Sequence, residues 1–135
     1  MKTIFTNGCF DILHIGHVKL LQYCHELAYQ TTGGPGRVVV GLNSTCSVRR
    51  LKGNSRPINV ESDRKYVLES LKYVDEVIIF NEDTPYQLIK QLSPHIIVKG
   101  GDYNPADVVG CDIAEVRIFN TVAGISTTDI ISRLK

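Results

Sequence analysis

The chain has 135 residues, 43% of them hydrophobic and 21% charged, which is the composition of one ordinary globular domain and excludes a disordered chain. Its formal net charge of +1 excludes a general attraction to nucleic acid or to an anionic membrane, so an anion-binding site must be local. No apolar run approaches the ~18 residues of a membrane span, and the start of the chain lacks the apolar core of a signal peptide, so we expect a cytoplasmic protein.

Short apolar runs alternate with longer segments of helical period, which is typical of α/β domains. We predict strands at residues 3–6, 37–42, 76–80, 96–98 and 116–119. We predict helices at residues 15–28, 62–72, 84–93 and 126–134. The predicted fold class is α/β, with a five-stranded parallel sheet that carries helices on both faces.

The expected helix starts carry capping residues. Thr84-Pro85-Tyr86-Gln87 has the form of a capping box with proline at the first helical position. Asn59 or Ser62 is expected to cap the helix predicted at residues 62–72, and Ser126 begins the helix predicted at residues 126–134. The segment Thr31–Gly36 is predicted to be a surface loop.

The four cysteines are widely spaced and form no C-x-x-C pair: Cys9, Cys24, Cys46 and Cys111. We therefore expect four free thiols, with no role in the chemistry and no zinc knuckle.

The stretch from Thr6 to His17 joins the first strand to the first helix. A helix start offers unpaired amides and a partial positive charge, and His14 and His17 are spaced to point from one side of that first turn. Gly16 between them leaves room for a phosphate near the backbone. A zinc site is the alternative, with Cys9 as a third ligand, but a structural zinc needs four ligands and no second pair is present.

His14-Ile15-Gly16-His17 resembles the H-x-G-H signature of the nucleotidylyltransferase superfamily, and Ser126-Thr127-Thr128 resembles its second signature. Three segments between them, Arg50–Gly53 with Arg56-Pro57, Glu82–Pro85 and Val98–Tyr103, are similar to the family of adenylyltransferases that make ADP-heptose. In many bacteria that domain follows a sugar kinase domain. The resemblance implies a Rossmann-like single domain over residues 1–135, in a stand-alone version of the enzyme.

The resemblance implies that AMP passes from ATP to D-glycero-β-D-manno-heptose 1-phosphate by in-line attack on the α-phosphorus, with release of pyrophosphate. Charge neutralisation and positioning are the protein's main tasks in such a transfer. Magnesium is expected to enter on the ATP phosphates rather than in a carboxylate cage, because no acidic cluster lies beside the histidines. We expect no metal site on the protein itself, and a homodimer.

The roles that the resemblance implies fall into three groups. The expected catalytic residues are His14, His17 and Lys52. The expected nucleotide-binding residues are Gly8, Cys9, Phe10, Gly16, Arg64, Lys99, Gly100, Gly101, Asp102, Ser126, Thr127 and Thr128. The expected sugar-phosphate-binding residues are Asp11, Arg50 and Arg56. Lys52 is expected on a flexible segment after the second strand, where its compact charge can follow the α-phosphate.

Thr45 departs from this family, whose members usually have Asn-Ser-Asp where this chain has Asn43-Ser44-Thr45. The main alternative is a cytidylyltransferase that uses CTP and glycerol 3-phosphate, which shares both signatures. Those enzymes tend to have an arginine shortly before Ile-Ser-Thr-Thr, and this chain has none there. An FAD synthetase of archaeal type is a third possibility. A nucleotide sensor without catalysis is a fourth, but it leaves both histidines, Lys52 and the Ser-Thr-Thr start unexplained.

Overall fold

The computed structural model of the chain describes residues 1–29, 34–120 and 127–134. The strands are β1 (Lys2–Gly8), β2 (Gly36–Asn43), β3 (Glu76–Phe80), β4 (Ile96–Gly100) and β5 (Glu115–Phe119). The helices are α1 (Ile15–Tyr29), α2 (Thr45–Lys52), α3 (Glu61–Glu69), α4 (Tyr86–Leu92) and α5 (Thr127–Leu134), with a short 3₁₀ helix at Pro105–Asp107. No helix of the described ranges has the length and apolarity needed to cross a bilayer.

The strands form one parallel sheet in the order β3-β2-β1-β4-β5. The central strand β1 pairs with β2 along its whole length, from Lys2 opposite Gly36 to Gly8 opposite Leu42. On its other side β1 pairs with β4 through Ile4 and Phe5. The strand order therefore reverses between β1 and β4, and in open parallel sheets ligands bind at the carboxyl ends of the strands at such a reversal.

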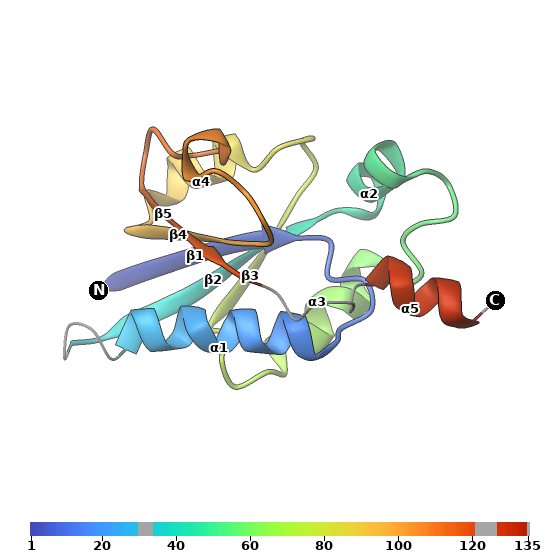
Figure 1. Cartoon of the computed structure of the whole chain (residues 1–135), viewed down its shortest axis with the longest axis horizontal. Helices are drawn as coiled ribbons and strands as arrows, with labels where there is room; N and C mark the ends of the chain where they lie inside the picture. Colours follow the sequence, from blue (N-terminus) through green and yellow to red (C-terminus); the bar gives the residue numbers. More distant parts are fainter. Residues whose placement is uncertain (30–33, 121–126, 135) are drawn as a thin grey trace.

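Apolar layers cover both faces of the sheet (Figure 1). On one face α1 packs through Leu20, Cys24 and Leu27 against β1 and β2, and Leu68 of α3 joins the same layer. On the other face Ile89 of α4 packs with Phe5, Val39 and Ile97. Burying both faces of a parallel sheet explains why its strands are apolar on both sides rather than alternating.

The predicted fold class, the five strands and the helices on both faces are confirmed. The helix α2 differs from the prediction, because the segment that ends at Lys52 is helical rather than flexible. Its start is capped by Ser44, whose side chain accepts a hydrogen bond from the N–H of Ser47 at 3.1 Å. The predicted capping residues of two helices were wrong: α4 starts after Pro85 and α3 after Val60, and neither start has a side-chain cap.

Candidate active site

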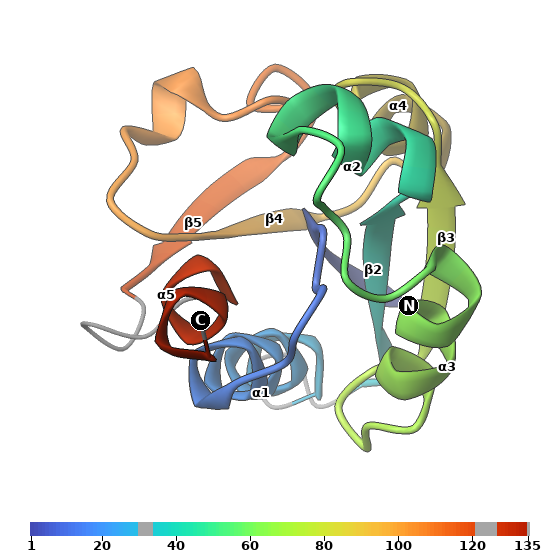
Figure 2. The same cartoon turned by 90° about the vertical axis from the view of Figure 1, so that its right-hand side faces the viewer.

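The candidate site lies at the edge of the sheet where the parallel strands end. Figure 2 looks onto this edge, where the start of α1, the helix α2 and the helix α5 surround the end of β1. Figures 1 and 2 both place α5 beside the start of α1. At this edge the strand order reverses between β1 and β4, which is where open parallel sheets bind their ligands.

The loop that follows β1 turns sharply before it reaches the histidines. Phe10 has a φ of +46°, a left-handed conformation that is costly for a bulky residue and is found most often at functional sites. Its side chain is 5% exposed and packs in the core beneath α1, with its ring centroid 5.2 Å from that of His17. The core thus holds the turn that presents the histidine motif.

The rings of His14 and His17 stack with their centroids 3.9 Å apart and an interplanar angle of 27°. The backbone N–H of His14 donates to Nδ1 of His17 at 3.3 Å, and the N–H of Gly16 donates to Nδ1 of His14 at 3.1 Å. A ring nitrogen that accepts a hydrogen bond carries no proton, so each neutral imidazole has its proton on Nε2. Both rings therefore can present an Nε2–H donor to an anion.

The surroundings of His17 lower its pKa from 6.5 to about 4. Burial is the largest cause, and the charges of His14 and Lys52 act in the same direction. Burial also lowers the pKa of His14. His17 is consequently neutral at pH 7, and the Lys52 charge lies near enough to influence it. The end of α2 and the start of α1 therefore belong to one electrostatic site.

Gly16 is required by the ring of His14. A Cβ at position 16 would lie 2.8 Å from Cε1 and 3.0 Å from Nδ1 of that ring. These are distances that real Cβ atoms hardly ever show, so a larger residue must displace the imidazole. The glycine of the motif thus permits the bond that fixes the tautomer of His14.

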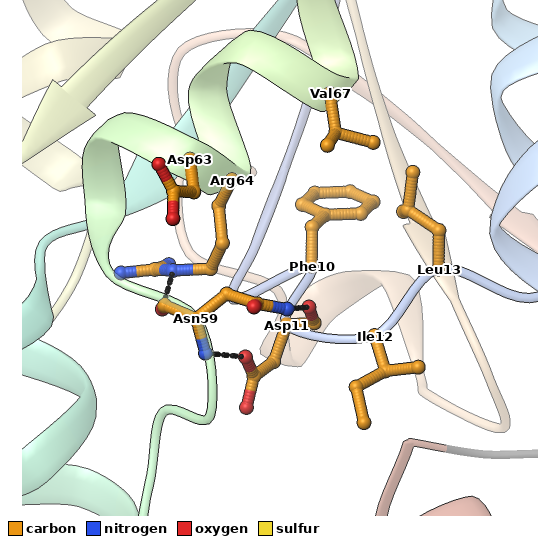
Figure 3. Close-up of a pocket in the computed structure, with 8 residues that line it drawn as sticks. All are labelled: Phe10, Asp11, Ile12, Leu13, Asn59, Asp63, Arg64 and Val67. Atoms are coloured by element: carbon orange, nitrogen blue, oxygen red, sulfur yellow. Dashed lines mark hydrogen bonds between the residues drawn. The ribbon is translucent and has the colours of Figure 1, made fainter.

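Asp11 lies in the loop after β1 and binds Asn59, in the segment that follows α2 (Figure 3). Its carboxylate accepts hydrogen bonds from the N–H of Ile58 at 2.7 Å and of Asn59 at 2.8 Å. Nε of Arg56 lies 3.3 Å from the same carboxylate, whose side chain is fully buried. Asp11 and Arg56, both predicted to bind the sugar phosphate, therefore lie together as a buried pair.

Arg64 joins three parts of the chain that converge below the site. Its Nε donates to the carbonyl of Asn59 at 2.9 Å, and its Nη1 donates to the carbonyls of Cys9 at 2.8 Å and of Asn43 at 2.7 Å. Arg64 is 1% exposed. Its guanidinium connects the loop after β1, the end of β2 and the residues before α3. A contact between Arg64 and nucleotide stays a prediction.

Arg50 contacts the loop after β3. Its Nε forms an ion pair with Asp83 at 2.9 Å, and its Nη2 donates to the carbonyl of Asn81. Lys52, two residues further, is the exposed last residue of α2. The proposed sugar-phosphate role of Arg50 stays a prediction.

The end of β4 lies beside the end of β1 at the same edge of the sheet. Gly101 has a φ of +114°, and a Cβ there would lie 3.0 Å from the Tyr103 ring, so this turn requires glycine. The ammonium of Lys99 lies 5.0 Å from the centroid of the same ring. Lys99 and Gly100 end the strand, and Asp102 follows in the exposed turn.

Thr127 and Thr128 begin α5, and Ser126 lies outside the described residues. Gly8 and Cys9 end the central strand and begin its loop. Among the residues that the structure describes, no three His, Cys, Asp or Glu side chains gather in a way that could hold a metal ion. All four cysteines are free, as expected, and burial raises the pKa of Cys24 to about 12.

Sequence reasoning missed two groups that organise the site. Asn59 was considered only as a helix cap, yet its backbone and side chain bind both Asp11 and Arg64. Thr45 and Glu61 exchange hydrogen bonds between α2 and α3, although they are 16 residues apart. Neither group has a local sequence signal, because the partners meet only in the folded chain.

The profile of the cytidylyltransferase-like family matches residues 5–133. The chain is 56% identical over 135 residues to a protein of Nitratiruptor sp. named bifunctional protein HldE, covering 99% of this chain and 28% of that protein. It is 54% identical to the protein of that name from Campylobacter concisus, covering 27% of it. The chain thus spans just over a quarter of the length of these relatives. A solved lipopolysaccharide core biosynthesis protein from Thermoplasma volcanium superposes with a TM-score of 0.71 at 26% identity, covering 90% of this chain and 97% of that one.

Proposed function

Because the chain belongs to the cytidylyltransferase-like family, we propose that it transfers a nucleoside monophosphate from a nucleoside triphosphate to the phosphate of a sugar. One observation carries this proposal. Two neutral imidazoles stand at a helix start with their Nδ1 atoms occupied by backbone amides, and the Lys52 charge lies close by. Such a group of donors suits the oxygens of a polyphosphate.

In the proposed reaction an oxygen of the acceptor phosphate attacks the α-phosphorus of the nucleotide. The bond from that phosphorus to the oxygen that bridges to the β-phosphate breaks, and pyrophosphate leaves. Charge grows on the phosphate oxygens during this exchange, and preorganised donors stabilise that charge most when they need not rearrange. His14 and His17 would donate from Nε2, and Lys52 would neutralise charge on the α-phosphate. No covalent intermediate with the protein is needed.

The nucleotide would lie at the carboxyl ends of β1 and β4. Its base would rest against the turn at Gly100 and Gly101, and its β- and γ-phosphates would lie at the start of α5 beside Ser126, Thr127 and Thr128. The position of α5 beside the start of α1 supports this arrangement. Magnesium would enter bound to the phosphates and water, as it commonly does with nucleotide substrates.

The finer proposal is that the nucleotide is ATP and the acceptor is D-glycero-β-D-manno-heptose 1-phosphate, which gives ADP-heptose. It is supported by the motif resemblance along the chain and by the identity of 56% and 54% to two proteins named HldE. The chain covers just over a quarter of these relatives, so the proposal concerns only the nucleotidyl transfer. A cytoplasmic location is part of this proposal, because both substrates are phosphorylated metabolites.

The experiment measures pyrophosphate release with ATP and CTP, each combined with a panel of sugar and polyol phosphates. We expect the highest kcat/KM for ATP with the heptose 1-phosphate. Turnover only with CTP and glycerol 3-phosphate would replace this substrate pair with the cytidylyltransferase alternative. A protein that binds ATP but releases no pyrophosphate with any acceptor would favour the nucleotide sensor.

We also propose a homodimer. A pocket of about 240 Å³ lies between the loop after β1 and α3 (Figure 3). Phe10, Ile12, Leu13 and Val67 form the apolar part of its lining, and the polar part consists of Asp11, Asn59, Asp63 and Arg64. The neighbouring Ile58 and Val60 are 55% and 50% exposed. An apolar face of this kind is common at subunit contacts. Sedimentation equilibrium of the chain decides between monomer and dimer.

A further inference from the structure

The first turns of α2 and α3 are fastened to each other by two hydrogen bonds between Thr45 and Glu61. The N–H of Thr45 donates to Oε1 of Glu61 at 2.9 Å, and the N–H of Glu61 donates to Oγ1 of Thr45 at 3.0 Å. Each side chain therefore accepts a hydrogen bond from the first N–H of the other helix, which has no partner within its own helix. The Glu61 carboxylate also lies at the positive ends of two helix dipoles, where negative charge is favourable.

We propose that Thr45 and Glu61 are positioning residues that set where Lys52 stands relative to the histidines. The proposal rests on the nucleotidyl transfer proposed above. Thr45 is the first residue of α2 and Lys52 is the last. A helix of that length is a rod of about 12 Å at 1.5 Å per residue, so fixing its start fixes the direction in which its end points.

The start of α2 is held far more firmly than its end. Ser44 and Ser47 at the start are buried, and the hydroxyl of Ser47 donates to the carbonyl of Glu82 at 3.1 Å. At the other end Leu51 is 52% exposed, and Arg50 reaches only the exposed loop after β3, through Asp83 and the carbonyl of Asn81. Lys52 lies two residues beyond Arg50, so its position follows the direction of the helix, which the contacts at the start help to set.

A chain of bonds connects this start to the histidine motif without passing through the sheet. Glu61 is the first residue of α3, and Arg64 on the same helix donates to the carbonyl of Cys9, which begins the loop leading to His14. The Thr45–Glu61 pair is the step of this chain that joins α2 to α3. It thus links the element that carries the cation to the element that holds the imidazoles.

The first experiment needs no substrate. It follows the NMR titration of the His17 imidazole in the wild type and in Lys52→Ala, Thr45→Val, Thr45→Ser and Glu69→Gln. The Lys52 charge lowers the pKa of His17, so Lys52→Ala should raise it. Thr45→Val, which keeps the shape but removes the acceptor, should raise the pKa of His17 in the same direction. Thr45→Ser should keep the wild-type value, as should Glu69→Gln, which changes an exposed carboxylate at the other end of α3.

The second experiment measures pyrophosphate release. Thr45→Val and Glu61→Ala should each lower kcat about tenfold or more with the KM for ATP within about twofold, because a displacement of about 1 Å can cost as much as 100-fold in rate. The double variant should be no slower than the slower single one, since both remove one link. Thr45→Ser should recover the wild-type rate.

A wild-type pKa of His17 in Thr45→Val would overturn the positioning role, and so would an unchanged pKa in Lys52→Ala. Rate losses that simply multiply in the double variant would also overturn it. If the wild type releases no pyrophosphate with any acceptor, the proposed function fails, and the titration still decides whether the pair sets the position of Lys52.

Discussion

The ring of His14 folds back over Gly16, so that Nδ1 accepts the glycine's own N–H at 3.1 Å while a methyl group at position 16 would stand 2.8 Å from Cε1. Gly16, the second residue of α1, therefore determines the orientation of the His14 ring.

Gly16→Ala should separate helix stability from activity. Alanine favours the helix over glycine by up to about 1 kcal/mol, so the thermal midpoint should stay the same or rise. The new methyl group must displace the His14 ring, so we expect the rate of pyrophosphate release to fall about 100-fold, the scale for one misplaced donor. Differential scanning calorimetry and kinetics on one sample test this, and a fully active variant would contradict the account of the motif.

His17→Ala should lower kcat by about 10²- to 10⁴-fold while the protein stays folded. The ring is only partly buried, so the core loses little. The loss should fall on kcat more than on the KM for ATP, because the donor acts on charge that grows in the transition state. Circular dichroism checks the fold, and wild-type turnover would exclude His17 from the chemistry.

Acidification should destabilise the fold through His17. Its pKa is about 4 in the folded chain and near 6.5 when unfolded, so between these values the unfolded chain binds a proton that the folded chain does not. This stability is fully present above pH 6.5 and is lost as the pH falls toward 4. Urea unfolding between pH 7 and 4.5 should therefore show a decline that His17→Ala makes shallower. Identical slopes in both proteins would mean that the folded His17 titrates normally.

Lys52→Ala should lower kcat about 100-fold or more with a smaller effect on the KM for ATP. Lys52→Arg should recover only part of the rate, because a planar guanidinium cannot replace a compact ammonium at one oxygen. Arg49→Ala is the matched control, since Arg49 is an exposed cation on the same helix. Equal losses in Lys52→Ala and Arg49→Ala would indicate a general charge effect rather than a catalytic cation.

Arg64→Ala should reduce the free energy of unfolding by about 3 kcal/mol or more. The carbonyls of Cys9, Asn43 and Asn59 lose their donor, and an unpaired buried acceptor such as that of Asn43 costs about 1–3 kcal/mol. Arg49→Ala should change the stability by no more than about 0.5 kcal/mol. Urea denaturation measures both, and similar small effects would show that the Arg64 bonds contribute little.

The sheet and the histidine motif were predictable because their signals are local. Apolar runs predict the strands, and the spacing of His14 and His17 indicates a shared helix start. The helix α2 was not predicted, because Val48 and Ser47 are its only buried residues and no apolar stripe marks it. Its one local signal is Ser44 as a cap.

The partners of the charged residues could not be predicted either. Asp11 and Arg64 look like ligand-binding residues in the sequence, but the structure shows backbone groups from distant segments around them. Which carbonyl or amide lies beside a buried charge depends on how the loops pack, and no spacing along the chain encodes this.

Because β1 pairs with β4, the candidate site is complete only after distant parts of the chain have come together. The central strand is complete near the beginning of the chain, yet one of its neighbours is β4, and the N–H of Thr3 donates to Nδ1 of His95, 92 residues further along. Parallel pairings of such long range must wait for costly loop closure, so they form slowly. During synthesis the histidine motif therefore emerges early but lacks the neighbouring strand end until β4 has been made. An N-terminal fragment that ends before β4 carries the complete motif and should be unable to hold a nucleotide.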